Sequence, residues 1–230
     1  MSDPHTQDNP AQQIGAADVA AALERAARRL IELRDTLNTL DAALGDGDSG
    51  LTAEKGARGL LAYLDATPPG DDLGKWLAGA GMAYNRAAPS TMGALVATAL
   101  MRAGKAALGR GTLDPPLLAR MLLEADAGIQ ERGKSAPGDK TVLDALHPAA
   151  QAFSAAISAG RSPAEADSET LEAARQGRDA AIGLRSRVGR AGWVGERSEG
   201  QPDPGTVLFV GALEAVLGAD FSEPGSILGG

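Results

Sequence analysis

The sequence has no cysteine, few aromatic residues and no long apolar run, and each absence excludes a class of protein. Without cysteine the chain has neither disulfide bonds nor thiolate metal sites, which fits an intracellular setting. Aromatic residues make up only 3% of the chain, so any core must be built mainly from aliphatic side chains. No apolar stretch reaches membrane-spanning length, and the N-terminus lacks the basic and apolar segments of a signal peptide. We therefore expect a cytoplasmic protein that does not enter a membrane.

The charge balance argues against a role in nucleic-acid binding. The formal net charge is -8, and no run of Lys or Arg interrupts this acidic character. A protein that binds the phosphate backbone generally presents a basic face. We expect no nucleic-acid partner.

The 230 residues are rich in alanine and show apolar residues at helical spacing, which predicts an all-helical bundle. A helical domain is expected over 14–218, between a disordered tail at 1–13 and a flexible tail at 219–230. No convincing strand is visible. The expected helices are 16–40, 51–66, one from Asp71 or Asp72 to about 86, one from Ser90 or Thr91, 115–132, one capped by Asp139, 164–186, and 205–217.

Three aspartates, Asp41, Asp46 and Asp48, crowd into a glycine-rich stretch between the first two expected helices. Carboxylates so close together repel one another, and a hard divalent cation such as Mg²⁺, Mn²⁺ or Ca²⁺ relieves that repulsion. A calcium EF-hand is excluded, because counting from Asp46 places Leu51 where glycine is required and Ala57 where Glu is required. A solvated acidic turn remains the alternative to an open Mg²⁺ site.

Two further stretches break the helical pattern. Residues 133–144 form a turn-rich loop, and residues 189–205 form a second glycine-rich loop whose length is typical of functional loops. The Walker pattern for phosphate binding is missing, because the Gly133-Lys134-Ser135 run lacks the upstream glycine.

Together, these three segments resemble the nucleotide-binding L subunit (a Dak2/DhaL-type domain) of the dihydroxyacetone kinase family. The first is similar to that subunit's Asp-x₄-Gly-Asp-x-Asp signature and runs from Asp41 to Asp48. The second, 133–144, resembles its Gly-Lys-x-x-Pro-Gly-Asp-Lys-Thr-x-x-Asp stretch, and the third, 189–205, resembles its closing segment. The segments occur in the family's order and, together with the chain between them, span most of residues 16–217.

The resemblance implies an antiparallel eight-helix barrel that holds ADP or ATP through two Mg²⁺ ions at one end. It implies that Asp41, Asp46 and Asp48 are metal ligands and, with Arg190, form the catalytic set. The implied phosphate contacts are Ser49, Gly50, Leu51, Thr52, Thr91 and Met92. The implied contacts to the rest of the nucleotide are Gly133 and Val142 beside the adenine, with Arg190, Asp203, Pro204 and Gly205 closing over it.

Two positions depart from the family pattern. Ser49 stands where the family usually has His, and the run Pro89-Ser90-Thr91-Met92-Gly93 replaces a glycine-rich loop. Glycine lets a backbone approach a phosphate closely, which Pro and Met do not. The metal site therefore matches the family, whereas the phosphate geometry is expected to differ.

By resemblance, the chain is a phosphotransferase subunit of a dihydroxyacetone-kinase-like enzyme that phosphorylates a small hydroxy-ketone or related sugar. A separate K subunit would hold that substrate. The phosphoryl donor is either ATP or a protein of the phosphotransferase system that recharges bound ADP, and a homodimer remains open. Three alternatives stand beside this reading: a non-catalytic nucleotide-binding regulator, a metal-dependent phosphohydrolase and a purely structural bundle.

Overall fold

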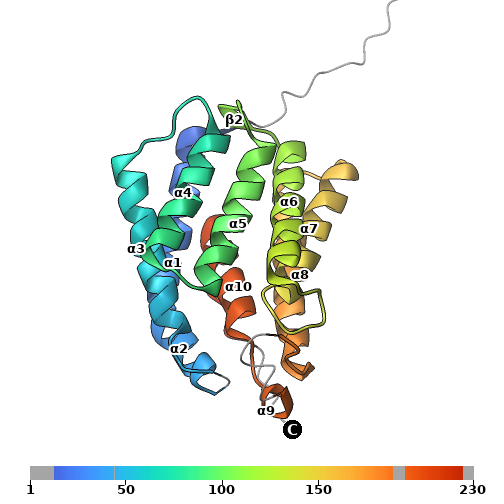
Figure 1. Ribbon diagram of the computed structural model, residues 1–230. Coiled ribbons are helices and arrows are strands. Elements are labelled where there is room, and N and C mark those ends of the chain that lie inside the picture. Colours follow the sequence, from blue (N-terminus) through green and yellow to red (C-terminus); the bar gives the residue numbers. More distant parts are fainter. Residues whose placement is uncertain (1–12, 44, 189–194, 225–230) are drawn as a thin grey trace, which may run out of the picture.

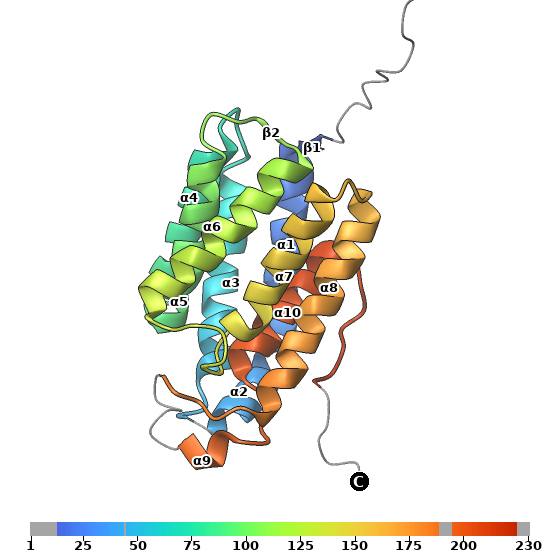
Figure 2. The same cartoon turned by 90° about the vertical axis from the view of Figure 1, so that its right-hand side faces the viewer.

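In the computed structural model, residues 13–43, 45–188 and 195–224 are described, and they form an all-α protein (Figure 1). Eight long helices of this part run antiparallel in a ring, each packing on the next, and the last closes the ring on the first (Figure 2). The long helices in ring order are α1 (Ala16–Glu32), α3 (Ser49–Ala66), α4 (Leu73–Ala87), α5 (Thr91–Ala106), α6 (Pro115–Gly133), α7 (Leu143–Ser158), α8 (Pro163–Ala180) and α10 (Pro204–Leu217). The expected antiparallel eight-helix barrel is confirmed.

Shorter elements complete the described chain. Helix α2 (Arg34–Ala42) extends α1, a 3₁₀ turn η1 (Ala181–Gly183) follows α8, and α9 (Gly195–Ser198) precedes α10. Strands β1 (Ile14–Gly15) and β2 (Thr112–Leu113) pair antiparallel, with Ile14 opposite Leu113, at the end of the barrel away from α2 and α9 (Figure 2). The sequence pattern did not indicate this pair, because two residues are too few to show strand alternation.

Several helices begin at polar capping residues, of which Asp72 and Ser90 are among those that the sequence suggested. The side chains of Asp72 and Asp114 accept hydrogen bonds from backbone N–H groups in the first turns of α4 and α6. Ser90 does the same for α5, and Asp203 for α10. Such caps satisfy N–H groups that have no partner within the helix. They fix where α5 and α10 start, at the same end of the barrel.

The core consists mostly of Leu, Ala and Val side chains, as the low aromatic content requires. Small residues bring some helices very close: a Cβ on Gly74 would lie 2.4 Å from the carbonyl oxygen of Gly104, where α4 crosses α5. Any larger side chain there would push the two helices apart. None of the described helices combines the length and apolarity needed to cross a membrane.

The expected helix over 16–40 is two helices. Leu33 separates them with a ψ of -2°, away from the helical value near -42°. Both Leu33 and Leu37 are nevertheless buried, so the apolar spacing continues through the break. Because periodicity records which side chains face the core, it did not reveal a change in the backbone at a single residue.

Two other helix boundaries differ from expectation. Helix α7 begins at Leu143 with Val142 before it, and Asp139 is not its cap. The Asp139 carboxylate instead accepts a hydrogen bond from the backbone N–H of Ala136 at 2.8 Å, so it stabilises the preceding turn. The helix expected over 164–186 ends at Ala180 and continues only as η1. Both differences widen the loops at the same end of the barrel.

The chain after α10 lies against the barrel over its described part, 219–224. Glu214, which is fully buried, accepts a hydrogen bond from the backbone N–H of Ser222 at 3.2 Å. Arg178 of α8, also buried, donates to the carbonyl oxygens of Ser222 and Glu223. The Arg29 guanidinium lies 5.6 Å from the centre of the Phe221 ring. The first residues of the expected C-terminal tail thus make specific contacts with α1, α8 and α10.

Candidate functional site

The three aspartates of the acidic stretch come together at the end of the barrel where α2 leads into α3. Asp41 lies in the last turn of α2, and Asp46 and Asp48 lie in the following loop. One carboxylate oxygen from each residue can be chosen so that all three lie within 4.8 Å of one another. Asp41 is partly buried, whereas Asp46 and Asp48 are exposed. The arrangement is open to solvent on one side.

Asp41 also organises the loop through its side chain. Its Oδ2 atom accepts hydrogen bonds from the backbone N–H groups of Asp48 at 3.0 Å and Ser49 at 3.1 Å. The chain therefore folds back over the Asp41 carboxylate before α3 begins. A carboxylate at a helix start is also favoured by the helix dipole.

The first turn of α3 packs tightly on α2. A Cβ on Gly50 would lie 1.9 Å from the carbonyl oxygen of Arg34, so only glycine fits there. Ser49 Oγ donates to the carbonyl oxygen of Leu37 at 3.0 Å, and the N–H of Leu51 donates to Asn38 Oδ1 at 3.1 Å. Asn38 was not singled out from the sequence, where it is an ordinary polar residue inside a helical pattern.

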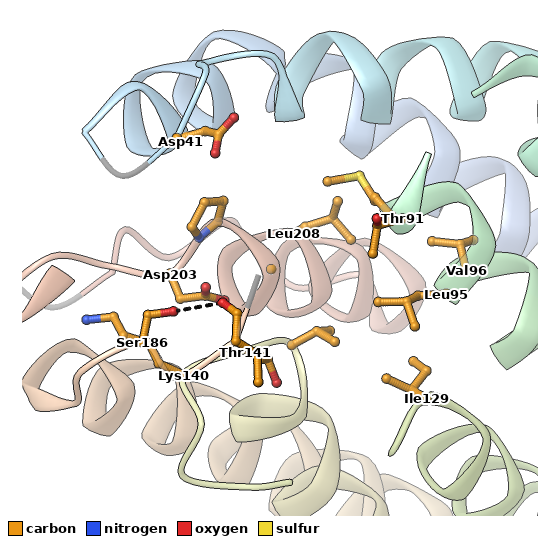
Figure 3. Close-up of a pocket in the computed structure, with 16 residues that line it drawn as sticks. Asp41, Thr91, Leu95, Val96, Ile129, Lys140, Thr141, Ser186, Asp203 and Leu208 are labelled. Atoms are coloured by element: carbon orange, nitrogen blue, oxygen red, sulfur yellow. Dashed lines mark hydrogen bonds between the residues drawn. The ribbon is translucent and has the colours of Figure 1, made fainter. Parts of the chain in front are cut away.

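A pocket of about 300 Å³ lies beside the acidic loop (Figure 3). Asp41 lies on one side of it, and Asp203 and Thr141 lie across from Asp41. The volume is at the lower end of the range for small-molecule sites. Of the residues that the sequence suggested, the pocket is lined by Asp41, Thr91, Met92, Val142, Asp203, Pro204 and Gly205.

The other suggested residues lie outside this lining. Gly133 borders a neighbouring pocket that shares Thr91 and Leu95 with the first. Ser49, Gly50, Leu51 and Thr52 form the first turn of α3, and Asp46 and Asp48 precede it on the acidic loop. Arg190 lies outside the residues that the structure describes.

One half of the pocket is apolar. The apolar wall comes from three helices, α5, α6 and α10, and its side chains are Leu95, Val96, Ile129 and Leu208 (Figure 3). The sequence showed these residues only as apolar positions on helices. Periodicity predicts that they face inward, but it does not separate a side chain that lines a cavity from one that fills the core.

Asp203 combines a structural and an electrostatic role at the pocket. Its carboxylate caps α10 by accepting the backbone N–H of Thr206 at 2.8 Å. Burial raises the pKa of Asp203 to about 7, and the nearby Asp144 adds to that rise. Backbone hydrogen bonds and Lys140 act in the opposite direction. The carboxyl group therefore exchanges its proton near neutral pH, unlike an ordinary aspartate.

Asp144 shapes the loop that lies, like Asp203, across the pocket from Asp41. Its two carboxylate oxygens accept the backbone N–H groups of Gly138 at 2.6 Å and Thr141 at 2.7 Å. The turn between them places Lys140, Thr141 and Val142 along the pocket. The last residue of the 133–144 motif thus has a definite structural task.

The histidine of α7 does not belong to this site. His147 Nδ1 lies 2.8 Å from an oxygen of Asp126, which is buried on α6. The contact joins two neighbouring helices, and neither residue lines the pocket. His147 is therefore a packing residue between α6 and α7.

Taken together, the site has a cluster of oxygen ligands at one side and an apolar cavity beside it. Oxygen ligands on an open loop suit a hard cation that also binds phosphate oxygens. An apolar cavity suits a planar organic group.

Comparisons with known proteins agree with this geometry. The family model of the DAK2 domain matches residues 43–218. The chain is 32% identical over 202 residues to human triokinase/FMN cyclase, covering 86% of this chain and 34% of that protein. It is 33% identical over 179 residues to the ADP-binding subunit DhaL of the PEP-dependent dihydroxyacetone kinase of Escherichia coli, covering 76% of this chain and 83% of that subunit.

A further relative is the L-erythrulose kinase of Pectobacterium atrosepticum, 32% identical over 226 residues, with 94% of this chain and 37% of that protein covered. The chain thus spans about a third of the length of triokinase/FMN cyclase and of this kinase. Among solved structures, the dihydroxyacetone kinase from C. freundii in complex with AMP-PNP and Mg²⁺ shares the fold, with a TM-score of 0.69, 23% identity, and coverage of 96% of this chain and 37% of that one. On the family model and the sequence identities, the chain belongs to the DAK2 domain family.

Proposed function

We propose that this chain binds ADP or ATP together with Mg²⁺ and serves as the phosphotransferase subunit of a dihydroxyacetone-kinase-like enzyme. The acceptor would be a small hydroxy-ketone or a related sugar held by a separate K subunit. The observation that carries the proposal is the position of Asp41. Its carboxylate belongs to the three-aspartate cluster and also lines the apolar pocket, so a metal ion and a nucleotide would meet there.

The residues present suit Mg²⁺. The cluster offers only oxygen ligands, and these lie close enough together to share an ion. Asp41, Asp46 and Asp48 are the residues that would hold it, and two ions are expected once phosphate oxygens add further ligands. Bound Mg²⁺ would supply neutralisation of phosphate charge during phosphoryl transfer.

The pocket suits the rest of a nucleotide. The apolar side chains of Leu95, Val96 and Ile129 can pack against the base, and Thr91 lies at the start of α5 beside them. Backbone N–H groups at a helix start favour an anion such as a phosphate. On the opposite wall, the turn from Asp203 to Gly205 would cover the nucleotide, with Arg190 proposed to assist.

The named relatives support a phosphoryl-transfer role. They include a triokinase, an L-erythrulose kinase and an ADP-binding subunit of a dihydroxyacetone kinase. Trioses, erythrulose and dihydroxyacetone, the compounds in these names, are small hydroxy-carbonyl compounds, and they motivate the proposed acceptor class. The same relatives leave the donor open between ATP and a phosphotransferase-system protein that recharges bound ADP.

A nucleotide-binding regulator is the second candidate, and one feature of the loop favours it. The backbone N–H groups of Asp48 and Ser49 already donate to Asp41, and that of Leu51 donates to Asn38. Because these N–H groups at the start of α3 already have acceptors, fewer donors are available to the phosphoryl group during its transfer. Phosphoryl transfer to dihydroxyacetone, measured with a purified K subunit and ATP, separates the two candidates. Phosphate release without an acceptor would instead indicate a phosphohydrolase.

Calorimetry with ADP and Mg²⁺ tests the central proposal. We expect the wild-type chain to bind ADP only when Mg²⁺ is present, and Asp46→Ala to lose that binding. Asp35→Ala is the matched control, because the Asp35 side chain on α2 is 98% exposed and belongs to no cluster of metal ligands among the described residues. Unchanged affinity in Asp46→Ala would remove the aspartate cluster from the site.

A further inference from the structure

Lys140 is an unusual residue because its charged end is buried. The residue is 2% exposed, and its Nζ atom donates hydrogen bonds to the carbonyl oxygens of Ile182 at 3.0 Å and Leu184 at 2.9 Å. A third bond goes to the carbonyl oxygen of Ser198. An ammonium group has three donors and no acceptor. All three donors are therefore used on backbone oxygens.

These acceptors lie on separate parts of the chain. Ile182 and Leu184 follow α8, whereas Ser198 is the last residue of α9. The two parts are also joined directly, because the backbone N–H of Ser186 donates to Ser198 Oγ at 2.8 Å. Lys140 itself belongs to the loop before α7. One side chain thus joins three segments that are distant in sequence.

Each of these segments leads into the pocket wall. Lys140 is followed by Thr141 and Val142, and Leu184 is followed by Ser186, which also lines the pocket (Figure 3). Ser198 precedes the turn at Asp203 that begins α10. A displacement of any one segment would therefore move a different part of the same wall.

The backbone at Lys140 indicates that this placement is imposed by the surroundings. Its φ is 59°, in the left-handed region that few residues other than glycine adopt. Such a conformation persists only where the surrounding structure stabilises it. Asp144 provides part of that stabilisation through the N–H groups of Gly138 and Thr141 on either side.

Burial and the nearby carboxylates act on the charge of Lys140 in opposite directions. Burial lowers the pKa of Lys140, whereas the carboxylates of Asp203, Glu199 and Asp144 raise it. Three carbonyl oxygens can be satisfied together only by the ammonium form, since a neutral amine has two N–H donors.

We propose that Lys140 is a positioning residue whose ammonium group holds the loop before α7, the chain after α8 and the end of α9 together as one wall of the nucleotide pocket. This inference rests on the proposed nucleotide binding and assigns the geometry of that wall to one buried charge. Without the ammonium group, three buried carbonyl oxygens lose their donor, which is costly unless the segments separate and admit water. Separation would spoil the pocket, so nucleotide affinity would fall.

The absence of cysteine from the chain allows a direct chemical test. In Lys140→Cys, alkylation in denaturant followed by refolding modifies only the introduced thiol. Treatment with 2-bromoethylamine rebuilds a lysine-like side chain with an ammonium group, and treatment with 1-iodopropane gives a neutral side chain of the same length. The two products differ at this position only in the charged, hydrogen-bonding end.

Lys134→Cys, treated in the same ways, is the matched control. Lys134 lies in the same loop and has a positive φ of 50°, but its side chain is exposed. Affinity for ADP with Mg²⁺ is measured by calorimetry at a temperature where each protein is folded, and thermal stability is measured without nucleotide. Wild-type protein passes through the same treatments.

We expect propylated Lys140→Cys to bind ADP at least tenfold more weakly than wild type, and the aminoethylated form to recover to within about threefold. All Lys134→Cys forms should bind as wild type does. Equal affinity of the two alkylated Lys140→Cys forms would overturn the inference. If the aminoethylated form folded and the propylated form did not, the inference would also be overturned. The ammonium group would then be required for folding of the whole domain and not specifically for the pocket. A failure of wild type to bind ADP would be a failure of the proposed function instead.

Discussion

The carboxylate of Asp41 accepts a hydrogen bond from the backbone N–H of Asp48 at 3.0 Å, so two aspartates of one cluster are linked through the backbone as well as by charge. Asp41 therefore has two tasks that a mutation can separate. Its oxygen atoms shape the loop, and its negative charge is available to a cation.

Asp41→Ala should lower the free energy of unfolding by about 1–2 kcal/mol in the absence of metal, because the N–H groups of Asp48 and Ser49 lose their acceptor. Asp41→Asn keeps an oxygen acceptor and should lose less stability, yet it removes the charge. Urea unfolding in EDTA measures the first effect, and the rise in melting temperature on adding Mg²⁺ and ADP measures the second. We expect both variants to lose the ligand-dependent rise. If Asp41→Asn retained the ligand-dependent rise in melting temperature, the Asp41 charge would not be needed for binding.

Asp203 should make stability depend on pH in a direction opposite to that of a salt-bridged aspartate. Burial raises its pKa in the folded protein to about 7, above the value of 3.8 for an ordinary aspartate. Between these values the folded state keeps a proton that the unfolded state has lost, so the contribution of this group to stability falls as the pH rises from about 4 to 7. The slope for one group is at most about 1.4 kcal/mol per pH unit.

Asp203→Asn tests this dependence, because asparagine also caps helices but does not ionise. The variant should be more stable than wild type at pH 8, and the difference should shrink toward pH 5. Urea unfolding across this range is the measurement. If the stability advantage of Asp203→Asn over wild type grew as the pH fell, the folded-state pKa of Asp203 would be lowered, not raised.

Much of the fold was predictable because local signals agreed with the final packing. Apolar spacing located the helices, and Asp72 and Ser90 marked helix starts that the structure contains. The break at Leu33 was not predictable, since the burial of Leu33 and Leu37 keeps the helical pattern intact through it. Asp139 was assigned as a cap because it precedes an apolar run, but Asp144 satisfies the N–H groups of that loop instead. Asp139 and Asp144 both lie near the start of α7, and the sequence does not show which backbone N–H groups each carboxylate accepts.

The site was predictable only in part for a similar reason. The acidic cluster is local in sequence, so Asp41, Asp46 and Asp48 stand out without a structure. Lys140 has no such signal, because its partners are backbone carbonyl oxygens more than forty residues away along the chain. Every residue has a backbone carbonyl oxygen, so the residue types do not show which of these oxygens accept a hydrogen bond from Lys140. The resemblance placed Lys140 inside a motif, but only the structure relates it to Ile182 and Leu184.

Gly50→Ala should destabilise the protein strongly, because the new Cβ would lie 1.9 Å from the carbonyl oxygen of Arg34. Relief requires α3 to move away from α2, and overpacking of this kind costs about 3 kcal/mol. Gly70→Ala is the control, since Gly70 is exposed and a Cβ there would meet nothing within 4 Å. Its effect should stay within about 0.5 kcal/mol. Urea unfolding of both variants tests the difference, and equal effects would show that α2 and α3 separate at little cost.

Glu214 offers a prediction away from the pocket. Its carboxylate is fully buried and accepts hydrogen bonds from Arg175 Nε at 2.9 Å and from the Ser222 backbone N–H at 3.2 Å. In Glu214→Gln, one of these donors would face an amide N–H₂ group, and the Arg175 charge would lose its partner. We expect the free energy of unfolding to fall by about 2–3 kcal/mol.

Affinity for ADP should not change in Glu214→Gln, because Glu214 lies in the last turn of α10, whereas the pocket is formed by the first. Glu172→Gln on the exposed side of α8 is the control and should alter neither quantity. Calorimetry with ADP and Mg²⁺, beside urea unfolding, measures both. A loss of affinity in Glu214→Gln alone would mean that the packing of residues 219–224 on the barrel is transmitted along α10 to the turn at Asp203. The two ends of this helix would then act as one unit, and the stability of the barrel and the shape of the pocket could not be treated separately.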